Sequence, residues 1–161
     1  MNIRIGHGID VHKLRPNIPF KLGGIAIDSP FGIEGHSDGD ALIHSLVDAL
    51  LGAMSLGDIG LFFPSNNLKF ENKSSEFFLL FALDKMKELC FNIVNIDINI
   101  ILEAPKINIY IPKMKLYLSN LIGISIKNIS IKATTTDGLG FIGKSKGILS
   151  TATVLIEKNE N

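Results

Sequence analysis

The segment from residue 94 to residue 102 constrains the fold most strongly, because apolar and polar side chains alternate along it. The apolar positions are Val94, Ile96, Ile98, Ile100 and Leu102, and the polar positions between them include Asn95, Asp97 and Asn99. Successive side chains of a β-strand point to opposite faces of the sheet, so this pattern predicts a half-buried strand. The apolar face of such a sheet must be covered, and helices packed on it give an α/β layer pair.

Helical periods occur on both sides of this strand. Apolar residues recur at i, i+3 and i+4 from residue 42 to about residue 57, which predicts an amphipathic helix. A second helix is expected over residues 75–90, and because its apolar residues occupy more than one face we expect burial on both sides. A third helix is expected to begin near Pro112 and to end at Gly123.

Four more segments have the composition of strands: residues 2–11, 20–27, 126–133 and 148–157, the second of them bent at Gly23-Gly24. The chain contains no internal repeat. We therefore expect residues 1–161 to form a single domain. Its expected fold is α/β, an α+β two-layer sandwich with a ferredoxin-like arrangement, in which a mixed β-sheet carries helices packed on one face.

Charge and hydrophobicity exclude several classes of protein. The 16 basic and 16 acidic side chains cancel, so no long-range positive field attracts nucleic acid or an anionic membrane. The strongest apolar run, residues 77–83, is too short to span a bilayer. A single cysteine excludes a disulfide within the chain and favours a cytoplasmic protein. The hydrophobic share of 46% suggests that some apolar surface packs against another subunit.

The stretch GLGFIGKS, residues 138–145, matches the phosphate-loop pattern of nucleotide hydrolases letter for letter. In those enzymes a helix begins directly after the Lys-Ser pair, and its N-terminus holds the phosphates. Here a segment with the period of a strand follows, and too little chain remains for the other parts of such an enzyme. We interpret GLGFIGKS as a Gly-rich, hairpin-like loop with one basic residue.

Three side chains near the N-terminus have the types and spacing of a metal site. Asp10 and His12 are two residues apart on a predicted strand, so both leave it on the same face. His44, on the first predicted helix, is a candidate third ligand, and Asp40 and Asp48 lie one turn away on either side to orient its imidazole. One carboxylate and two imidazoles suit zinc and leave a fourth position open for a substrate oxygen.

Structural roles account for some of the same residues. Asp10 is equally suited to capping a turn, and His12 to hydrogen bonding in the core. His7 has the wrong parity to join them, which favours a structural role. His36 lies in the Gly-rich stretch GIEGHSDGD, placed either to reach a ligand or to be solvated.

Two stretches have anion-binding chemistry, although both are also common in ordinary strands and surfaces. TTTD, residues 134–137, ends a predicted strand with hydroxyls suited to phosphate and a carboxylate suited to magnesium. APK, residues 104–106, follows another predicted strand and provides a turn and one cation.

Together these motifs resemble one known family. GHGIDVHKL, GHSDGDALIHSLVDALLGAMSLGDIG, APK and KATTTDGLGFIGK occur in the order and at the spacings typical of 2-C-methyl-D-erythritol 2,4-cyclodiphosphate synthases. The resemblance extends from residue 3 to about residue 156. It implies a phosphorus–oxygen lyase of non-mevalonate isoprenoid biosynthesis, which converts 4-diphosphocytidyl-2-C-methyl-D-erythritol 2-phosphate to the 2,4-cyclodiphosphate with release of CMP.

The resemblance also implies cofactors and partners. Asp10, His12 and His44 match the family's zinc ligands, one Zn²⁺ per subunit, and Asp137 matches a ligand of the Mg²⁺ or Mn²⁺ that bridges the substrate phosphates. The family is a homotrimer with its active sites between subunits. Lys144 matches a position associated with binding of an isoprenoid diphosphate in the trimer's central cavity. The implied compartment is the cytoplasm, or the plastid stroma if the source is a plastid-bearing eukaryote.

Individual roles carry over by position. His36 and Thr135 match the catalytic pair that stabilises the pentavalent transition state, and His36 with Ser37 matches a loop that closes on the substrate. The residues that match substrate-binding positions are Asp10, His12, His36, Ser37, Asp58, Ile59, Gly60, Phe63, Ala104, Lys106, Thr134, Thr135, Thr136, Asp137, Phe141 and Lys144.

Three positions depart from the family pattern. Asp137 stands where glutamate is usual and is shorter by one methylene, so the geometry of magnesium binding is expected to differ from that of the family. FPSNN, residues 63–67, replaces the usual F-P-D-T-D, so any role of acidic groups there is lost. Lys144 stands where arginine is common. It keeps the positive charge but lacks the planar set of N–H donors of the guanidinium group.

Two other functions stay open on the residues alone. A zinc-dependent phosphoester hydrolase would use zinc-bound water and a base, and its product would be linear. A non-catalytic zinc-stabilised assembly module would close the metal site with a fourth protein ligand. Neither explains the threonine run, APK and GDIG together.

Overall fold

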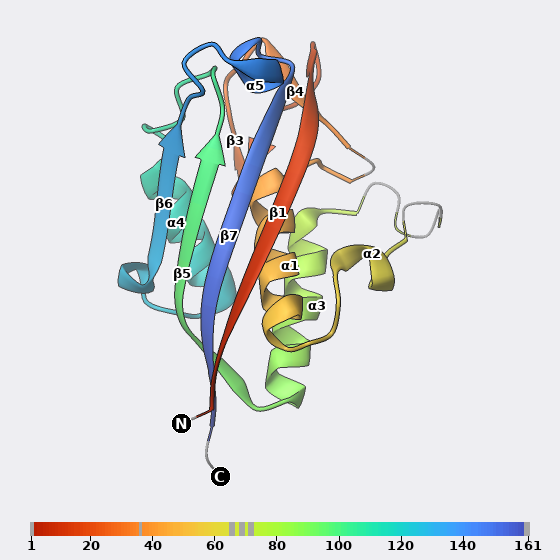
Figure 1. Cartoon of the computed structure of the whole chain (residues 1–161), viewed down its shortest axis with the longest axis vertical. Coiled ribbons are helices and arrows are strands. Elements are labelled where there is room, and N and C mark those ends of the chain that lie inside the picture. Colours follow the sequence, from red (N-terminus) through yellow and green to blue (C-terminus); the bar gives the residue numbers. More distant parts are fainter. Residues whose placement is uncertain (1, 36, 65–66, 68–69, 71–72, 160–161) are drawn as a thin grey trace.

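The computed structural model describes residues 2–35, 37–64, 67, 70 and 73–159 (Figure 1). Its main sheet has five strands, in the order β4-β1-β7-β5-β6. They are β1 (Ile3–Pro16), β4 (Phe31–Glu34), β5 (Phe91–Ile101), β6 (Ile129–Thr134) and β7 (Gly147–Lys158). β5 and β6 pair in parallel and the other neighbours pair antiparallel, so the sheet is mixed.

The longer helices lie on one face of this sheet, and a one-turn helix, the last in the chain, lies at the end of the strands (Figure 1). The helices are α1 (Ala41–Ala53), α2 (Ile59–Phe62), α3 (Ser75–Glu88), α4 (Ile111–Ile122) and α5 (Gly140–Gly143), with a 3₁₀ turn η2 at Ile126–Asn128. α1 packs on β1 and β7, α3 packs on α1 and β5, and α4 contacts β6. The predicted two-layer sandwich with a mixed sheet is confirmed. α1 and α3 both lie in the connection between the core strands β1 and β5. If they are counted as one helical unit, the core elements follow the order β-α-β-α-β-β.

A hairpin of β2 (Lys21–Leu22) and β3 (Ile25–Ala26) corrects one prediction. The sequence predicts a single bent strand over residues 20–27. Instead both central glycines have positive φ, 56° at Gly23 and 77° at Gly24. Positive φ at both central positions is the combination with which a two-residue turn folds two strands back on each other.

Other differences from the predictions are local. The expected burial of the second helix on both sides is wrong, because Phe77 and Leu80 of α3 remain 39% and 42% exposed. GLGFIGKS is more than a hairpin-like loop, since the chain makes one helical turn, α5, within it. The strand expected after Ser145 is confirmed as β7, which excludes a phosphate loop.

α1 lies unusually close to β1, because β1 has glycine where the two elements touch. A Cβ atom on Gly6 would lie 1.8 Å from the carbonyl oxygen of Ala49, and one on Gly8 would lie 2.1 Å from that of Ser45. α1 is buried along most of its length against the sheet and α3. The sequence of β1 therefore fixes where α1 rests.

The opposite face of the sheet is bare in the described part of the chain. Odd-numbered side chains of β1 point to this face, and Ile5, Ile9 and Val11 are 70%, 55% and 49% exposed. His7 shares the face, as its parity predicts, with Nδ1 2.9 Å from Thr153 Oγ1. Among the described residues, no helix has the length and apolar character needed to cross a bilayer.

Gly6→Ala tests the contact between α1 and β1. We expect this variant to lower the free energy of unfolding by about 1–3 kcal/mol or more, because its methyl group would overlap the Ala49 carbonyl. Gly52→Ala is the control, since a Cβ there meets nothing within 4 Å and alanine should raise the stability of α1 by about 1 kcal/mol. Urea denaturation at one protein concentration measures both, and an unchanged Gly6 variant would contradict the close packing.

Candidate metal centre and surrounding site

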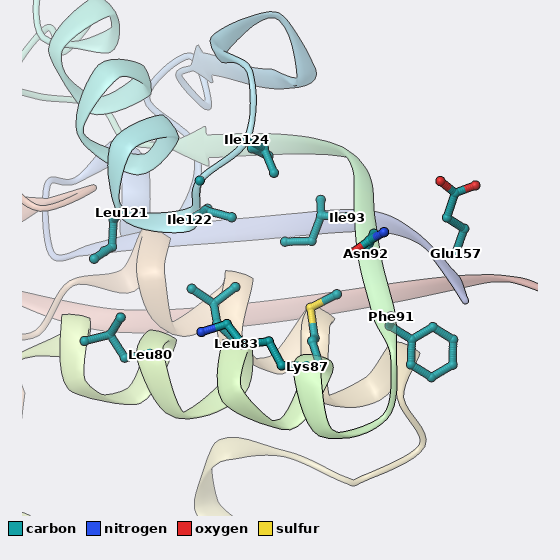
Figure 2. Close-up of a pocket in the computed structure, with 12 residues that line it drawn as sticks. Leu80, Leu83, Lys87, Phe91, Asn92, Ile93, Leu121, Ile122, Ile124 and Glu157 are labelled. Atoms are coloured by element: carbon teal, nitrogen blue, oxygen red, sulfur yellow. The ribbon is translucent and has the colours of Figure 1, made fainter. Parts of the chain in front are cut away.

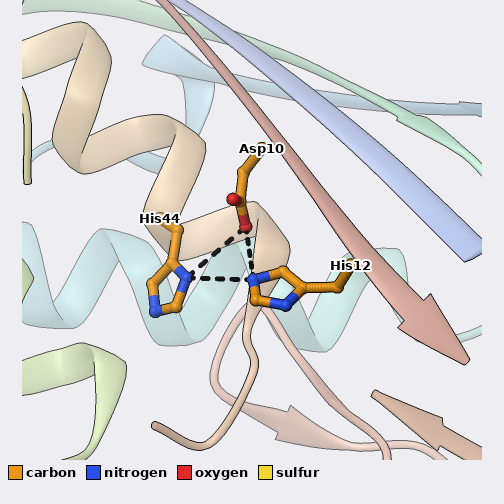
Figure 3. A group of neighbouring side chains, drawn as sticks. All are labelled: Asp10, His12 and His44. Carbon is orange, nitrogen blue, oxygen red and sulfur yellow. Dashed lines mark hydrogen bonds and ion pairs between the residues drawn. The ribbon is translucent and has the colours of Figure 1, made fainter. Parts of the chain in front are cut away.

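Three side chains from β1 and α1 meet at one point (Figure 3). His12 Nε2 lies 2.8 Å from Asp10 Oδ2, His44 Nδ1 lies 3.4 Å from the same oxygen, and the two nitrogens are 3.3 Å apart. Asp10 and His12 leave β1 on one face, as their spacing predicts, and α1 places His44 opposite them. The structure thus brings the three predicted ligands together.

The dimensions and chemistry of this triangle fit a divalent metal ion. Ligand atoms bound at 2.0–2.1 Å to a tetrahedral zinc lie roughly 3.3–3.4 Å from one another. Two of the three distances agree with that spacing. Asp10 Oδ2 is buried and, although close to His12, accepts no well-directed hydrogen bond. Lone pairs that converge in this way repel one another unless a proton or a cation lies between them.

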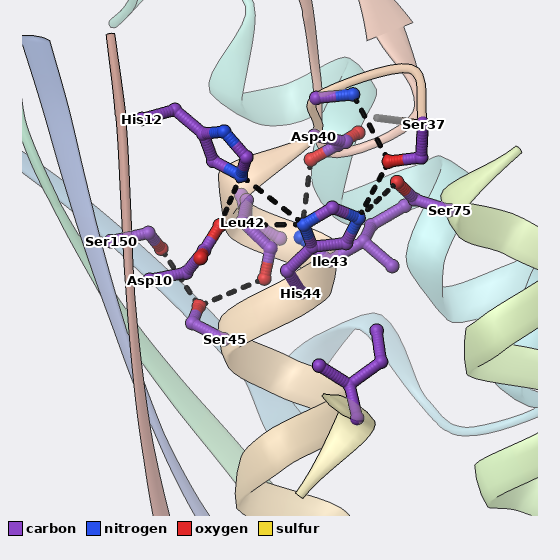
Figure 4. A network of polar contacts seen from close by, with 12 residues as sticks. Asp10, His12, Ser37, Asp40, Leu42, Ile43, His44, Ser45, Ser75 and Ser150 are labelled. Atoms are coloured by element: carbon purple, nitrogen blue, oxygen red, sulfur yellow. Dashed lines mark hydrogen bonds and ion pairs between the residues drawn. The ribbon is translucent and has the colours of Figure 1, made fainter. Parts of the chain in front are cut away.

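In each imidazole, the nitrogen that faces away from the shared point makes hydrogen bonds. The other nitrogen can therefore direct its lone pair at that point. His12 Nδ1 lies 2.9 Å from the carbonyl oxygen of Glu34, which can only accept, so Nδ1 carries the proton and Nε2 the lone pair. His44 Nε2 lies 2.9 Å from Ser75 Oγ and 3.1 Å from Ser37 Oγ (Figure 4). Both imidazoles therefore present a nitrogen to the shared point.

The pKa values reflect the same contacts. Burial raises the pKa of Asp10, but the interactions with His12 and His44 outweigh it and lower the pKa to about 2. Burial lowers the pKa of His12, whereas the contact with Asp10 raises it, and the net change is upward. A proton therefore competes with a metal ion for His12 Nε2 as the pH falls.

The prediction that Asp40 orients His44 is wrong. The carboxylate of Asp40 is fully buried and accepts hydrogen bonds from the backbone N–H groups of Gly23, Gly24 and Ile43. It caps α1 and closes the β2–β3 turn. Burial raises its pKa, and the three N–H groups offset only part of that rise.

The same prediction for Asp48 is also wrong. Asp48 Oδ1 accepts a hydrogen bond of 2.8 Å from the backbone N–H of Ile59 and so holds the start of α2. Burial raises the pKa of this carboxyl group. Asp58, a predicted substrate residue, caps α2 by accepting from Leu61 N–H at 2.9 Å, and Gly60 is exposed beside it.

Phe63 stands within an aromatic cluster next to the metal centre. Its ring lies 4.9 to 6.4 Å, between centroids, from five other rings: Phe62, Phe70, Phe77, Phe78 and Phe81. Phe78 also meets the ring of His44 edge-on at 6.0 Å. The predicted substrate residue Phe63 therefore belongs to an aromatic cluster that reaches His44 through Phe78.

The predicted phosphate and cytidine residues lie at the carboxyl ends of β5 and β6. Ile101 pairs with Thr134 in the parallel register, so the loops that follow the two strands are neighbours. Ala104 and Lys106 follow β5, and residues 134–137 end β6 and follow it, with Thr135, Asp137 and Lys106 exposed. In the sheet order β5 lies two strand spacings from β1 and β6 lies three, which separates the two loops from β1 by about 10 Å and about 14 Å at 4.8 Å per strand.

The remaining predicted residues are found at the edge of this region or outside it. Phe141 lies in α5 and Lys144 directly follows it, and both are exposed. His36 and Ser65 lie outside the described residues. A cavity of about 470 Å³ between α3, α4 and the start of β5 contains none of the predicted site residues (Figure 2).

Residues 3–157 match the sequence model of the YgbB family. The chain belongs to the YgbB family. A 2-C-methyl-D-erythritol 2,4-cyclodiphosphate synthase of Francisella philomiragia is 47% identical over 161 residues, which cover 98% of this chain and all of the relative. A synthase of the same name from Clostridium kluyveri is 46% identical over 98% of this chain and 96% of its own.

Solved structures of YgbB relatives share the fold. The bifunctional IspDF from Campylobacter jejuni superposes with a TM-score of 0.94 at 39% identity, covering 99% of this chain and 43% of that one. A CDP complex of IspF from Plasmodium falciparum superposes with a TM-score of 0.87 at 36% identity, over 98% of both chains.

Metal titration of the metal-free protein tests the centre. A metal bound only by the folded state stabilises it by RT ln(1 + [L]/Kd), about 2.7 kcal/mol at one hundred times Kd. This stabilisation should raise the thermal midpoint of unfolding when metal is added. We expect that rise to disappear in Asp10→Ala, because the variant loses one of the three ligands. Asp28→Ala, on an exposed residue, is the control and should keep it. An equal rise in the Asp10 variant would place the metal elsewhere.

Proposed function

We propose that this chain converts 4-diphosphocytidyl-2-C-methyl-D-erythritol 2-phosphate to 2-C-methyl-D-erythritol 2,4-cyclodiphosphate and CMP, as a phosphorus–oxygen lyase of isoprenoid precursor biosynthesis. The observation that carries this proposal is the meeting of Asp10, His12 and His44 at one point, in a chain that synthases of this name match along nearly its whole length. The CDP complex of a structural neighbour supports a cytidine nucleotide as part of the ligand. The cytoplasm is the proposed compartment.

The reaction requires positioning more than covalent help from the protein. An oxygen of the 2-phosphate attacks the β-phosphorus of the diphosphate, and the bond from that phosphorus to the CMP oxygen breaks with its electron pair. Nucleophile and electrophile belong to one molecule, so holding them in line and neutralising charge provide most of the acceleration.

Zinc is the metal that we assign to Asp10, His12 and His44. One carboxylate and two imidazoles suit it, and among the described residues no fourth His, Cys, Asp or Glu joins the group, which argues against a closed structural site. When bound, zinc supplies Lewis acidity to a phosphate oxygen. Asp137 is the proposed protein ligand of Mg²⁺ or Mn²⁺, ions that keep most of their ligands as water and substrate phosphates.

Different groups of residues are proposed to bind different parts of the substrate. Ser37, beside the metal centre, and His36 are proposed to contact the phosphates, and His36 with Thr135 to stabilise the transition state. The exposed Asp58 and Gly60 are proposed to bind the methylerythritol diol.

The cytidine and its phosphates are assigned to the second group of residues. Its proposed members are Ala104, Lys106, Thr134, Thr135 and Thr136, on the two adjacent loops. Ile59, Phe63 and Phe141 complete the apolar lining, and Lys144 is proposed to face an isoprenoid diphosphate in the central cavity of the assembly.

A homotrimer is the proposed assembly. The bare face of the sheet carries the exposed apolar side chains of β1, which favours contact with other copies of the chain. The metal centre and the cytidine loops are separated within one chain by two strand spacings for the loop after β5 and three for the loop after β6, roughly 10 Å and 14 Å. An active site between subunits would bring the loops of one copy to the metal centre of the next.

Phosphorus NMR with the cytidine diphosphate substrate, zinc and magnesium tests the activity. We expect coupled signals of a cyclic diphosphate together with stoichiometric CMP, and His44→Ala should reduce the rate by at least about 100-fold because a ligand of the charge-neutralising metal is lost. CMP with a linear product would instead indicate the zinc hydrolase. Zinc-loaded protein that releases no CMP would indicate the assembly module.

Ile5→Glu tests the proposed trimer. A carboxylate on the bare sheet face would be buried unpaired between subunits, so we expect dissociation to monomers. Leu116→Glu is the control, because Leu116 is a 55% exposed apolar residue of α4 in the helical layer, and this variant should remain a trimer. Light scattering after size-exclusion chromatography gives the masses, and an intact Ile5 variant would exclude this face as the interface.

A further inference from the structure

We propose that Ser75, fixed by Asp38 and Lys21, is the positioning residue that holds the imidazole of His44 in the orientation needed to bind the metal. This inference deepens the proposed function, because it concerns a ligand of the same centre. None of the three residues is among those predicted from sequence. They reach the centre from separate parts of the fold, α3, the loop before α1, and β2.

The contacts form a continuous chain of hydrogen bonds. Ser75 Oγ lies 2.9 Å from His44 Nε2 (Figure 4). On its other side Ser75 donates its hydroxyl proton to Asp38 Oδ1, and its backbone N–H donates to the same oxygen at 3.1 Å. Lys21 Nζ donates to Asp38 Oδ2 at 2.7 Å.

The direction of these bonds decides which nitrogen of His44 faces the metal. Burial raises the pKa of Asp38, but the hydrogen bonds from Lys21 and Ser75 outweigh it and lower the pKa, so the group is a carboxylate and can only accept. The hydroxyl proton of Ser75 is therefore committed to Asp38, so Ser75 Oγ accepts from His44 Nε2–H. With the proton on Nε2, the lone pair of Nδ1 is directed at Asp10 and His12, as a metal ligand requires.

Ser37 is the competing partner of His44, and it is less well placed to hold the ring. Its Oγ lies 3.1 Å from His44 Nε2 and is shared with the backbone N–H of Gly39. Ser37 is also partly exposed, whereas Ser75 is completely buried. Ser75 is therefore the better placed of the two serines to hold the ring.

Zinc affinity, measured by competition with a chromophoric chelator, tests this role. We expect Ser75→Ala to weaken zinc binding roughly 10- to 100-fold, the usual loss when the outer partner of a metal-bound histidine is removed. Ser74→Ala is the matched control, because Ser74 is the adjacent, exposed N-cap residue of α3 and its side chain makes no capping hydrogen bond. Its zinc affinity should be that of the unsubstituted protein, and Ser37→Ala should lose less than Ser75→Ala.

A second measurement separates positioning from stability. Nitrogen-15 NMR of the metal-free protein at mildly alkaline pH should place the proton of His44 on Nε2 in the unsubstituted protein, and this preference should weaken in Ser75→Ala. Should Ser75→Ala fail to fold, Asp38→Asn tests the same chain of bonds, because an amide can donate to Ser75 and no longer fixes the direction of its hydroxyl.

The outcomes are distinguishable. Unchanged zinc affinity and an unchanged tautomer in folded Ser75→Ala, or in Asp38→Asn where that is the folded variant, would overturn the inference and leave the proposed function intact. Equal losses in Ser74→Ala and Ser75→Ala would also overturn it, by assigning the effect to the start of α3. If the unsubstituted protein binds no zinc, the proposed function fails and the inference fails with it.

Discussion

The backbone contact between α1 and β1 sets the geometry of the metal centre. His44 comes from α1, and Asp10 and His12 come from β1. The spacing between the helix and the strand therefore determines how far the ligand atoms lie from one another. Metal sites tolerate displacements of only about 0.2 Å in their bond lengths. The glycines of β1 bring the helix within reach. A buried hydrogen bond of 2.9 Å between Ser45 Oγ on α1 and Ser150 Oγ on β7 then ties the helix to the sheet.

Asp40 holds the N-terminal end of α1, next to His44, in place. Its carboxylate joins the first turn of the helix to the β2–β3 hairpin, and Lys21 of that hairpin holds Asp38. Asp38 and Asp40, in the segment before α1, are therefore both held by hydrogen bonds to the β2–β3 hairpin. The groups proposed to contact cytidine and diol, such as Lys106 and Asp58, are exposed instead. A rigid metal centre beside an open binding surface suits a reaction that depends on positioning.

Period and parity predicted much of this arrangement. Alternation located β5, the i, i+3, i+4 pattern located α1, and the even spacing of Asp10 and His12 placed both on the helical side of the sheet. The prediction for Asp40 and Asp48 failed because proximity on a helix surface does not decide which group a carboxylate binds; backbone N–H groups at nearby chain ends competed successfully. Ser75 lies 31 residues beyond His44. No local pattern encodes a contact that arises only when α3 packs on α1.

The bare sheet face and the separation of the proposed binding groups both follow from the architecture of the sheet. In a two-layer fold, helices on one side leave the other side without cover, and here that side bears isoleucine and valine from β1. The same sheet keeps the metal centre and the loops after β5 and β6 apart, because one strand separates β1 from β5 and two separate it from β6. The trimer that we propose would cover the apolar face and would bring the loops of one copy to the metal centre of the next. In the proposed trimer, the side chains that drive assembly are therefore as necessary for catalysis as those that bind the metal.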